Sequence, residues 1–193
     1  MLPSLKQIVS GLNFAISLLR GQSFDVIKSK VIISPLGLWH VLITTTFISI
    51  LAKLTILKLA IVHNLPIRFV ISTFPLMIIE LCLFTMFVLY LLRFINKETY
   101  FYNFIISFLW LVSLQSSLVL LISILLWSFP ALAIFVALIG AVISIQILVT
   151  QFRLARQLLD VSGLIATVIV LGNILIGIVV GLLDQVAYGL VAG

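Results

Sequence analysis

Five long apolar segments, separated by short polar breaks, occupy most of the chain after residue 34. Their approximate bounds are 36–60, 68–93, 102–127, 131–152 and 161–183. An α-helix rises about 1.5 Å per residue, so each segment is long enough to cross a hydrocarbon layer about 30 Å thick. The pattern therefore predicts a single domain, 35–193, built from five transmembrane helices.

The polar breaks contain residues that are typical of turns and of membrane interfaces. They fall at 34–35, 63–66, 93–99, 128–130 and 153–160. Proline is tolerated at the first position of a helix, which fits the start of the first span. We expect the chain to turn or to form a short polar connection at each break, and the breaks are too short to hold a second domain.

The N-terminal segment, 1–34, has a different pattern. Apolar residues recur there at helical spacing and polar residues fill the other side; the apolar ones are Leu5, Ile8, Val9, Leu12, Ile16 and Leu19. This periodicity predicts an amphipathic helix at the membrane interface. Polar residues at positions 10, 13 and 17 interrupt the continuous core of a secretory signal, so we expect no cleavage. The helix can pack on the bundle or dock on the membrane surface, and the two are compatible.

Composition agrees with this interpretation. The chain is 64% hydrophobic and 8% charged, whereas soluble domains are roughly half apolar and a quarter charged. We therefore expect an all-α, polytopic integral membrane protein whose first partner is the lipid bilayer. The net charge of +6 comes from Lys and Arg placed singly or in pairs beside apolar runs. This distribution excludes a nucleic-acid interface, which needs a basic patch with interleaved aromatic residues.

The basic residues are distributed unequally between the two sides of the membrane. With the N-terminus inside, the inner segments hold Lys6, Arg20, Lys28, Lys30, Arg93, Lys97, Arg153 and Arg156. The outer segments hold only Lys53, Lys58 and Arg68. The excess of Lys and Arg on cytoplasmic loops predicts a cytoplasmic N-terminus and a periplasmic C-terminus.

Small residues form helical faces in the last two spans. The candidate packing residues are Ala133, Ala137, Gly140 and Ala141 in the fourth span, and Gly163, Ala166, Asn173, Gly177 and Gly181 in the fifth. Small side chains allow the backbones of two membrane helices to approach closely. We expect these faces to contact other helices, in the same chain, in partner membrane proteins or in a second copy.

Glu80 lies near the middle of the second span, and it is the main candidate for chemistry. An ionisable residue at this depth costs a few kcal/mol and must face a partner or a water-filled cavity. It carries a proton or binds a cation, or else it is a structural group bonded to a neighbouring helix or paired with Lys53 of the first span. Pro75, five residues earlier, is a potential kink that would expose a carbonyl.

Other catalytic patterns are absent from the sequence. His40 and His63 are separated by roughly 30 Å along the helical axis, so they cannot share a metal. The sequence contains no phosphate-binding glycine loop, no Gly-x-Ser-x-Gly elbow and no His-Glu-x-x-His pair. We expect a protein that is not an enzyme and needs no cofactor or metal, although a bound lipid is compatible with the sequence.

Two stretches resemble the Yip1 family of membrane proteins. The first runs from Phe74-Pro75-Leu76 to Asn103-Phe104, and the second from Gln151-Phe152-Arg153 to Ser162-Gly163-Leu164. The resemblance implies a polytopic, non-enzymatic protein connected with membrane organisation or trafficking. The Asp-Leu-Tyr-Gly-Pro-like motif of eukaryotic members is absent, so the small bacterial members, in the inner membrane, are the more similar ones. The predicted function is an accessory subunit that binds other membrane proteins, and the alternative is a small transporter or channel that uses Glu80.

Overall fold

The computed structural model describes residues 2–60 and 67–192, and within these ranges the chain forms helices and no strands. The elements are α1 (Leu5–Leu19), α2 (Phe24–Ile27), η1 (Lys28–Lys30), α3 (Pro35–Ala60), α4 (Ile67–Phe94), η2 (Glu98–Tyr100), α5 (Phe101–Ser128), η3 (Pro130–Leu132), α6 (Ala133–Leu159) and α7 (Gly163–Ala192). The all-α prediction is confirmed. The turn predicted at 63–66, with His63, lies outside the described residues.

Five helices of the described chain, α3 to α7, are long and apolar enough to cross a membrane. They correspond in order to the five predicted spans, and the shorter α1 precedes them. In a bilayer the backbone must satisfy its hydrogen bonds within each segment, which is why apolar sequences of this length form continuous helices. The protein is therefore a multi-pass membrane protein.

Helices α6 and α7 extend beyond the predicted spans. The polar connection expected at 153–160 is still helical: α6 continues through Arg153 and Arg156, and the chain leaves the helix only at Asp160, whose φ of 47° is left-handed. Similarly, α7 passes Asp184 and continues to Ala192. Charged residues mark where the hydrocarbon layer ends. A helix can extend beyond that layer into water, so the polar residues did not mark the helix ends.

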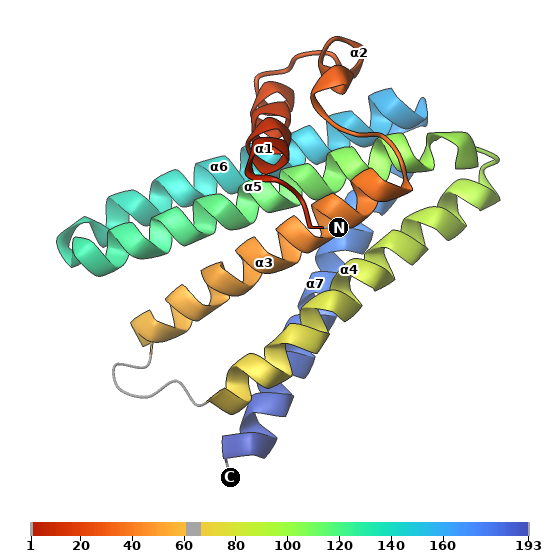
Figure 1. Ribbon diagram of the computed structural model, residues 1–193. Helices are drawn as coiled ribbons and strands as arrows, with labels where there is room; N and C mark the ends of the chain where they lie inside the picture. The colour runs from red at the N-terminus through yellow and green to blue at the C-terminus, as the bar shows by residue number, and fades with distance from the viewer. Residues whose placement is uncertain (1, 61–66, 193) are drawn as a thin grey trace.

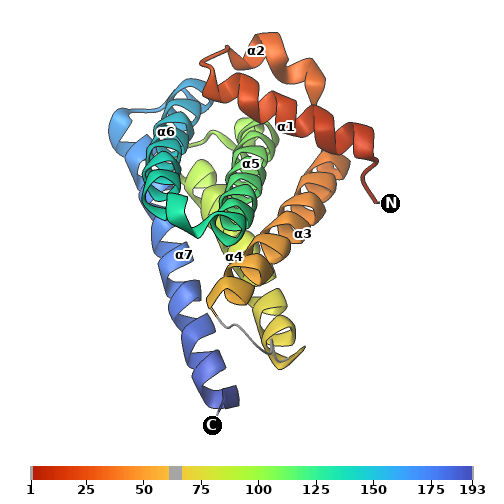
Figure 2. The ribbon, with the colours of Figure 1, turned by 90° about the vertical axis from the view of Figure 1, so that its left-hand side faces the viewer.

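The five long helices form a closed ring in the order α3, α5, α6, α7, α4 (Figure 1). α3 packs most extensively against the parallel α5, whereas α4 pairs with the antiparallel α7. The α5–α6 pair and the α4–α7 pair diverge away from the end where α1 lies. Figure 2 shows α1 and α2 lying across that end. One end of the bundle is therefore covered by the N-terminal segment.

Helix α1 begins with a capping box. The backbone N–H of Gln7 donates to Ser4 Oγ at 3.3 Å, and the backbone N–H of Ser4 donates to Gln7 Oε1 at 2.7 Å. This exchange satisfies two N–H groups that have no partner within the helix.

The face of α1 that is buried differs from the predicted apolar stripe. The buried residues are Gly11, Phe14, Ala15, Ser17 and Leu18, whereas Leu5 and Val9 are exposed. A Cβ at Gly11 would collide with the Trp110 ring of α5, so the absence of a side chain lets α1 approach α5. α1 therefore packs on the bundle through one face and leaves a second apolar surface, with Leu5 and Val9, available to the membrane.

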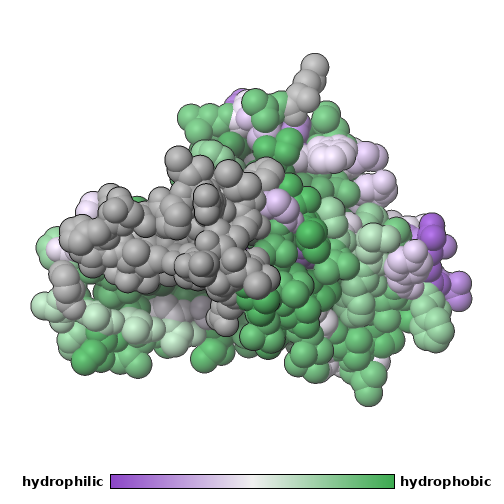
Figure 3. All heavy atoms as spheres, turned by 90° about the horizontal axis from the view of Figure 1, so that it is seen from below, coloured by the Kyte–Doolittle hydropathy of each residue, from purple (hydrophilic) through white to green (hydrophobic). Residues whose placement is uncertain are grey.

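The core lies in the half of the bundle nearer α1. Phe84 of α4 stacks on Phe108 of α5 with ring centroids 4.4 Å apart, and Phe104 lies beside Phe108 at 5.6 Å. Hydroxyl pairs join α3 to α5, with Thr45 and Ser113 at 2.6 Å and Ser49 and Ser116 at 2.7 Å. Such interhelical hydrogen bonds contribute roughly 0.6–2 kcal/mol each in membrane proteins. On the face seen in Figure 3, most of the coloured side chains are apolar and appear green.

Candidate functional site within the membrane spans

Glu80 lies halfway along α4, is partly buried and faces α7. A Cβ built on Gly177 would lie 3.3 Å from Glu80 Oε1. The carboxyl group therefore occupies space that a larger residue at position 177 would fill. Gly177 therefore packs against α4 of its own chain, so α4 covers this position of the Gly-x-x-x-Gly motif.

Lys53 of α3 forms an ion pair with Asp184 of α7. Its Nζ atom lies 3.5 Å from Asp184 Oδ2, and the Lys53 and Asp184 side chains are 34% and 14% exposed. The expected pairing of Lys53 with Glu80 is therefore not the one observed, although the Lys53 charge still acts electrostatically on the Glu80 carboxyl. Among the described residues, Glu80 forms no hydrogen bond or ion pair.

One face of α7 carries two glycines and a carboxylate. Gly177, Gly181 and Asp184 are spaced by four and three residues, which places them on one side of a helix. The helical rise separates Gly177 from Asp184 by about 10 Å. Among the described side chains, none lies within 4 Å of a Cβ built on Gly181. This face of α7 therefore extends from the level of Glu80 to the Lys53–Asp184 pair.

Aromatic packing closes the opposite half of the α4–α7 contact. A Cβ at Gly172 would collide with the Phe87 ring of α4, so the two helices touch closely at this level. Phe84, one turn from Phe87, is buried against Phe108. Glu80 thus lies between this aromatic packing on the side of α1 and the Lys53–Asp184 ion pair on the other side.

The predicted small-residue face of α6 is not covered by another helix of this chain. Ala133, Ala137 and Ala141 are all exposed. Gly140 borders α5, since a Cβ there would lie 3.1 Å from Ile122 Cδ1. The structure therefore places three of the four candidate residues on the outside of the bundle, where only lipid or a partner helix can contact them.

The predicted face of α7 is partly internal. Ala166 is fully buried, Asn173 is half-buried, and a Cβ at Gly163 would lie 3.9 Å from Phe152 of α6. The sequence pattern did not indicate the contact at Gly172 or the ion pair of Asp184. Asp184 lies seven residues after Gly177, and this spacing was the one signal that placed it on the same face.

In the part of the chain that the structure describes, no group of three or more His, Cys, Asp and Glu side chains gathers closely enough to hold a metal ion. No protein-family model, curated protein or solved structure matches the chain. The geometry of the spans is therefore the basis for a functional proposal.

Proposed function

We propose that this protein is a non-enzymatic accessory or membrane-organising subunit that binds other membrane proteins through the outer face of α6. The observation that carries this proposal is the exposure of Ala133, Ala137 and Ala141. These residues repeat every four positions, so they form a shallow groove on one side of a transmembrane helix. A partner helix can approach the α6 backbone closely along this groove.

The residues around the groove suit a partner within the bilayer. Large apolar side chains flank it, and Ile134, Leu138 and Val142 are 75%, 61% and 65% exposed. Membrane helices associate through close packing and interhelical contacts because lipid chains are as apolar as leucine side chains. A groove of small residues between large ones gives a partner helix more packing contact than lipid chains provide.

The remaining parts of the proposal come from the sequence. The resemblance to the Yip1 family supports a role in membrane organisation, and the absence of the eukaryotic motif supports a bacterial inner-membrane location. The distribution of Lys and Arg supports a cytoplasmic N-terminus. The structure gathers the ends of α4 and α6 and the whole of α1 at one end of the bundle, so most of the basic residues share that end.

The test is purification from membranes in a mild detergent, with mass spectrometry of the proteins that co-purify. One variant carries Ala133→Phe, Ala137→Phe and Ala141→Phe, which fills the groove. A matched control carries Leu171→Phe, Leu175→Phe and Ile178→Phe on the exposed face of α7, where the three residues are 50%, 60% and 54% exposed.

We expect a stoichiometric partner that the wild type and the α7 control retain and the α6 variant loses. Retention of the same partner by the α6 variant would contradict docking on this groove, as would the absence of any stoichiometric partner.

A second function, transport of a proton or cation through Glu80, is favoured by the position of this carboxyl group halfway along α4, where it has no hydrogen-bond or ion-pair partner among the described residues. The test is proton or cation flux into liposomes. Transport predicts a flux that Glu80→Gln abolishes while the protein remains folded, because a neutral amide neither cycles a proton nor balances a cation.

A further inference from the structure

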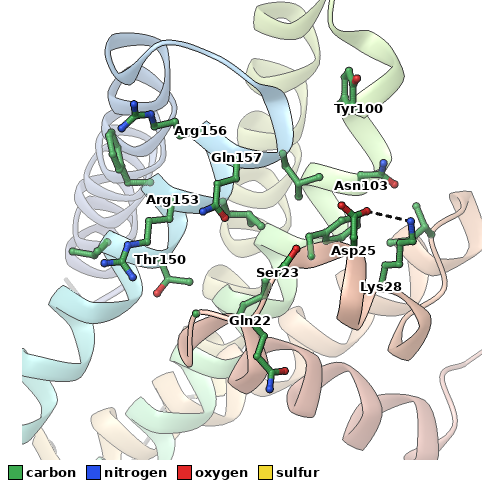
Figure 4. Close-up of a pocket in the computed structure, with 18 residues that line it drawn as sticks. Gln22, Ser23, Asp25, Lys28, Tyr100, Asn103, Thr150, Arg153, Arg156 and Gln157 are labelled. Carbon is green, nitrogen blue, oxygen red and sulfur yellow. Dashed lines mark hydrogen bonds and ion pairs between the residues drawn. The ribbon is translucent and has the colours of Figure 1, made fainter.

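A cavity of about 1190 Å³ lies at the α1 end of the bundle, between the N-terminal segment and the last turns of α6. Figure 4 shows Arg153, Arg156 and Gln157 projecting from α6 on one side, and Asp25 and Lys28 on the other. The volume exceeds the roughly 300–1,000 Å³ of most small-molecule pockets. The cavity is therefore large enough for a headgroup with part of its glycerol backbone.

The walls of the cavity are held in place by packing. On the N-terminal side, Phe24 of α2 meets Phe14 of α1 edge-to-face with ring centroids 6.2 Å apart, and Ile27 is 1% exposed. On the other side, Leu154 is buried and anchors α6 beside the two arginines. The polar lining residues therefore extend from fixed helices.

The charge of the lining favours an anion. Lys28 forms an ion pair with Asp25 at 3.2 Å, which neutralises the one carboxylate that lines the cavity. Among the described residues, neither Arg153 nor Arg156 has a hydrogen-bond or ion-pair partner. Two unpaired guanidinium groups remain, and guanidinium matches the geometry of a phosphate group.

The start of α5 also contributes to the lining of the cavity, through Tyr100 and Asn103.

The lining also changes from apolar to polar along α6. Val149 and Phe152 lie within the predicted span, and Arg153 and Gln157 follow immediately beyond it. This order matches the boundary between acyl chains and headgroups at the edge of a bilayer. A soluble anion would use the arginines alone, whereas a phospholipid would use both parts of the wall.

We propose that this cavity binds the phosphate-bearing headgroup of an anionic phospholipid, with Arg153 and Arg156 contacting the phosphate and with Val149 and Phe152 contacting the start of an acyl chain. The site is separate from the groove on α6 and from Glu80. Lipid binding there would make the position of the N-terminal segment depend on the lipid composition of the leaflet that the cavity faces.

The test uses the full chain in nanodiscs of phosphatidylcholine, with and without phosphatidylglycerol, and counts retained lipids by native mass spectrometry. The variant is R153Q/R156Q, which removes both guanidinium groups from exposed positions. The control is R20Q/R93Q, which removes the same charge from the same end of the bundle, outside the cavity lining. Size-exclusion chromatography and circular dichroism establish that each variant is folded.

We expect the wild type and the control to retain phosphatidylglycerol in preference to phosphatidylcholine. R153Q/R156Q should bind it about thirtyfold more weakly, since each basic residue contributes about a fivefold factor at an anionic membrane surface. Equal retention by the two double variants would overturn the proposal. It would equally be overturned if inorganic phosphate bound in an Arg153- and Arg156-dependent way while lipid retention did not change, because the ligand would then be a soluble anion.

Discussion

Gly177 and Gly181 lie one turn apart on α7 but have different surroundings. The space beside Gly177 holds the Glu80 carboxyl group, whereas no described side chain lies within 4 Å of a Cβ built on Gly181. Gly177 therefore permits a close contact between α4 and α7, and substitution at the two positions compares their importance for that contact.

Replacing Gly177 with Leu should destabilise the protein by roughly 1–3 kcal/mol, because the added side chain overlaps the position of Glu80 and forces α4 and α7 apart. Gly181→Leu should change stability much less, since no described side chain lies within 4 Å of a Cβ at this position. Thermal unfolding in detergent, followed by circular dichroism, compares the two variants. Equal destabilisation would show that the α4–α7 contact differs from the one described.

Glu80→Gln should leave the accumulation and thermal stability of the protein close to those of the wild type. The carboxyl group makes no hydrogen bond or ion pair among the described residues, and Lys53 is compensated by Asp184. An amide of the same shape also removes the free-energy cost of placing a charged carboxylate within the span. The measurement is the amount of folded protein per cell and its unfolding midpoint. A large loss of stability would mean that Glu80 has a structural partner.

Helices α1 and α6 pack on the rest of the bundle through different kinds of contact. α1 is held on the bundle by the fit of Gly11 against Trp110 and by the burial of Phe14, Ala15 and Leu18. α6 is anchored at its C-terminal half, where Ile147, Leu154 and Leu159 are buried, while its N-terminal half is exposed. The exposed half carries the small-residue groove, and the buried half positions the arginines of the cavity.

Gly11→Leu should detach α1 from α5, because its side chain cannot fit beside the Trp110 ring. We expect a loss of roughly 1–3 kcal/mol in the docking of α1. A cysteine placed at Ala15, which is 0% exposed, reports this change through maleimide labelling in a Cys82→Ala background. Labelling should be slow in the protein that carries only the new cysteine and Cys82→Ala, and fast when Gly11→Leu is added. The control substitution Val9→Leu should leave labelling slow. Slow labelling with Gly11→Leu would contradict this docking contact.

At the scale of the whole molecule, the bundle has two unlike ends. The α1 end is covered by the N-terminal segment and contains the cavity, and Lys97 there contacts Asp160 at the end of α6, with Nζ 3.7 Å from Oδ2. Towards the other end the α5–α6 and α4–α7 pairs diverge. The two ends also differ in charge, and this asymmetry gives the molecule a preferred orientation in a membrane.

Reporter fusions should show that orientation. A reporter placed after Asp160, where α6 has ended, should be cytoplasmic, and one placed after Ala192, where α7 has ended, should be periplasmic. Phosphatase and fluorescent-protein activities measured at both positions distinguish the two sides. The opposite pattern at both sites would reverse the assignment of the inner face and of the leaflet that the cavity faces.

The number, order and approximate bounds of the spans were determined by the sequence alone, because length and hydropathy are local properties that a bilayer selects directly. Only the tertiary structure decided which faces meet. It paired Lys53 with Asp184 instead of Glu80, put Gly177 against Glu80 and turned Ala133, Ala137 and Ala141 outward. In lipid, apolar residues suit the exterior as well as the core, so hydrophobic pattern carries little information about helix rotation. Side-chain shape and the pairing of a few polar groups decide it, and both depend on residues far apart in the chain.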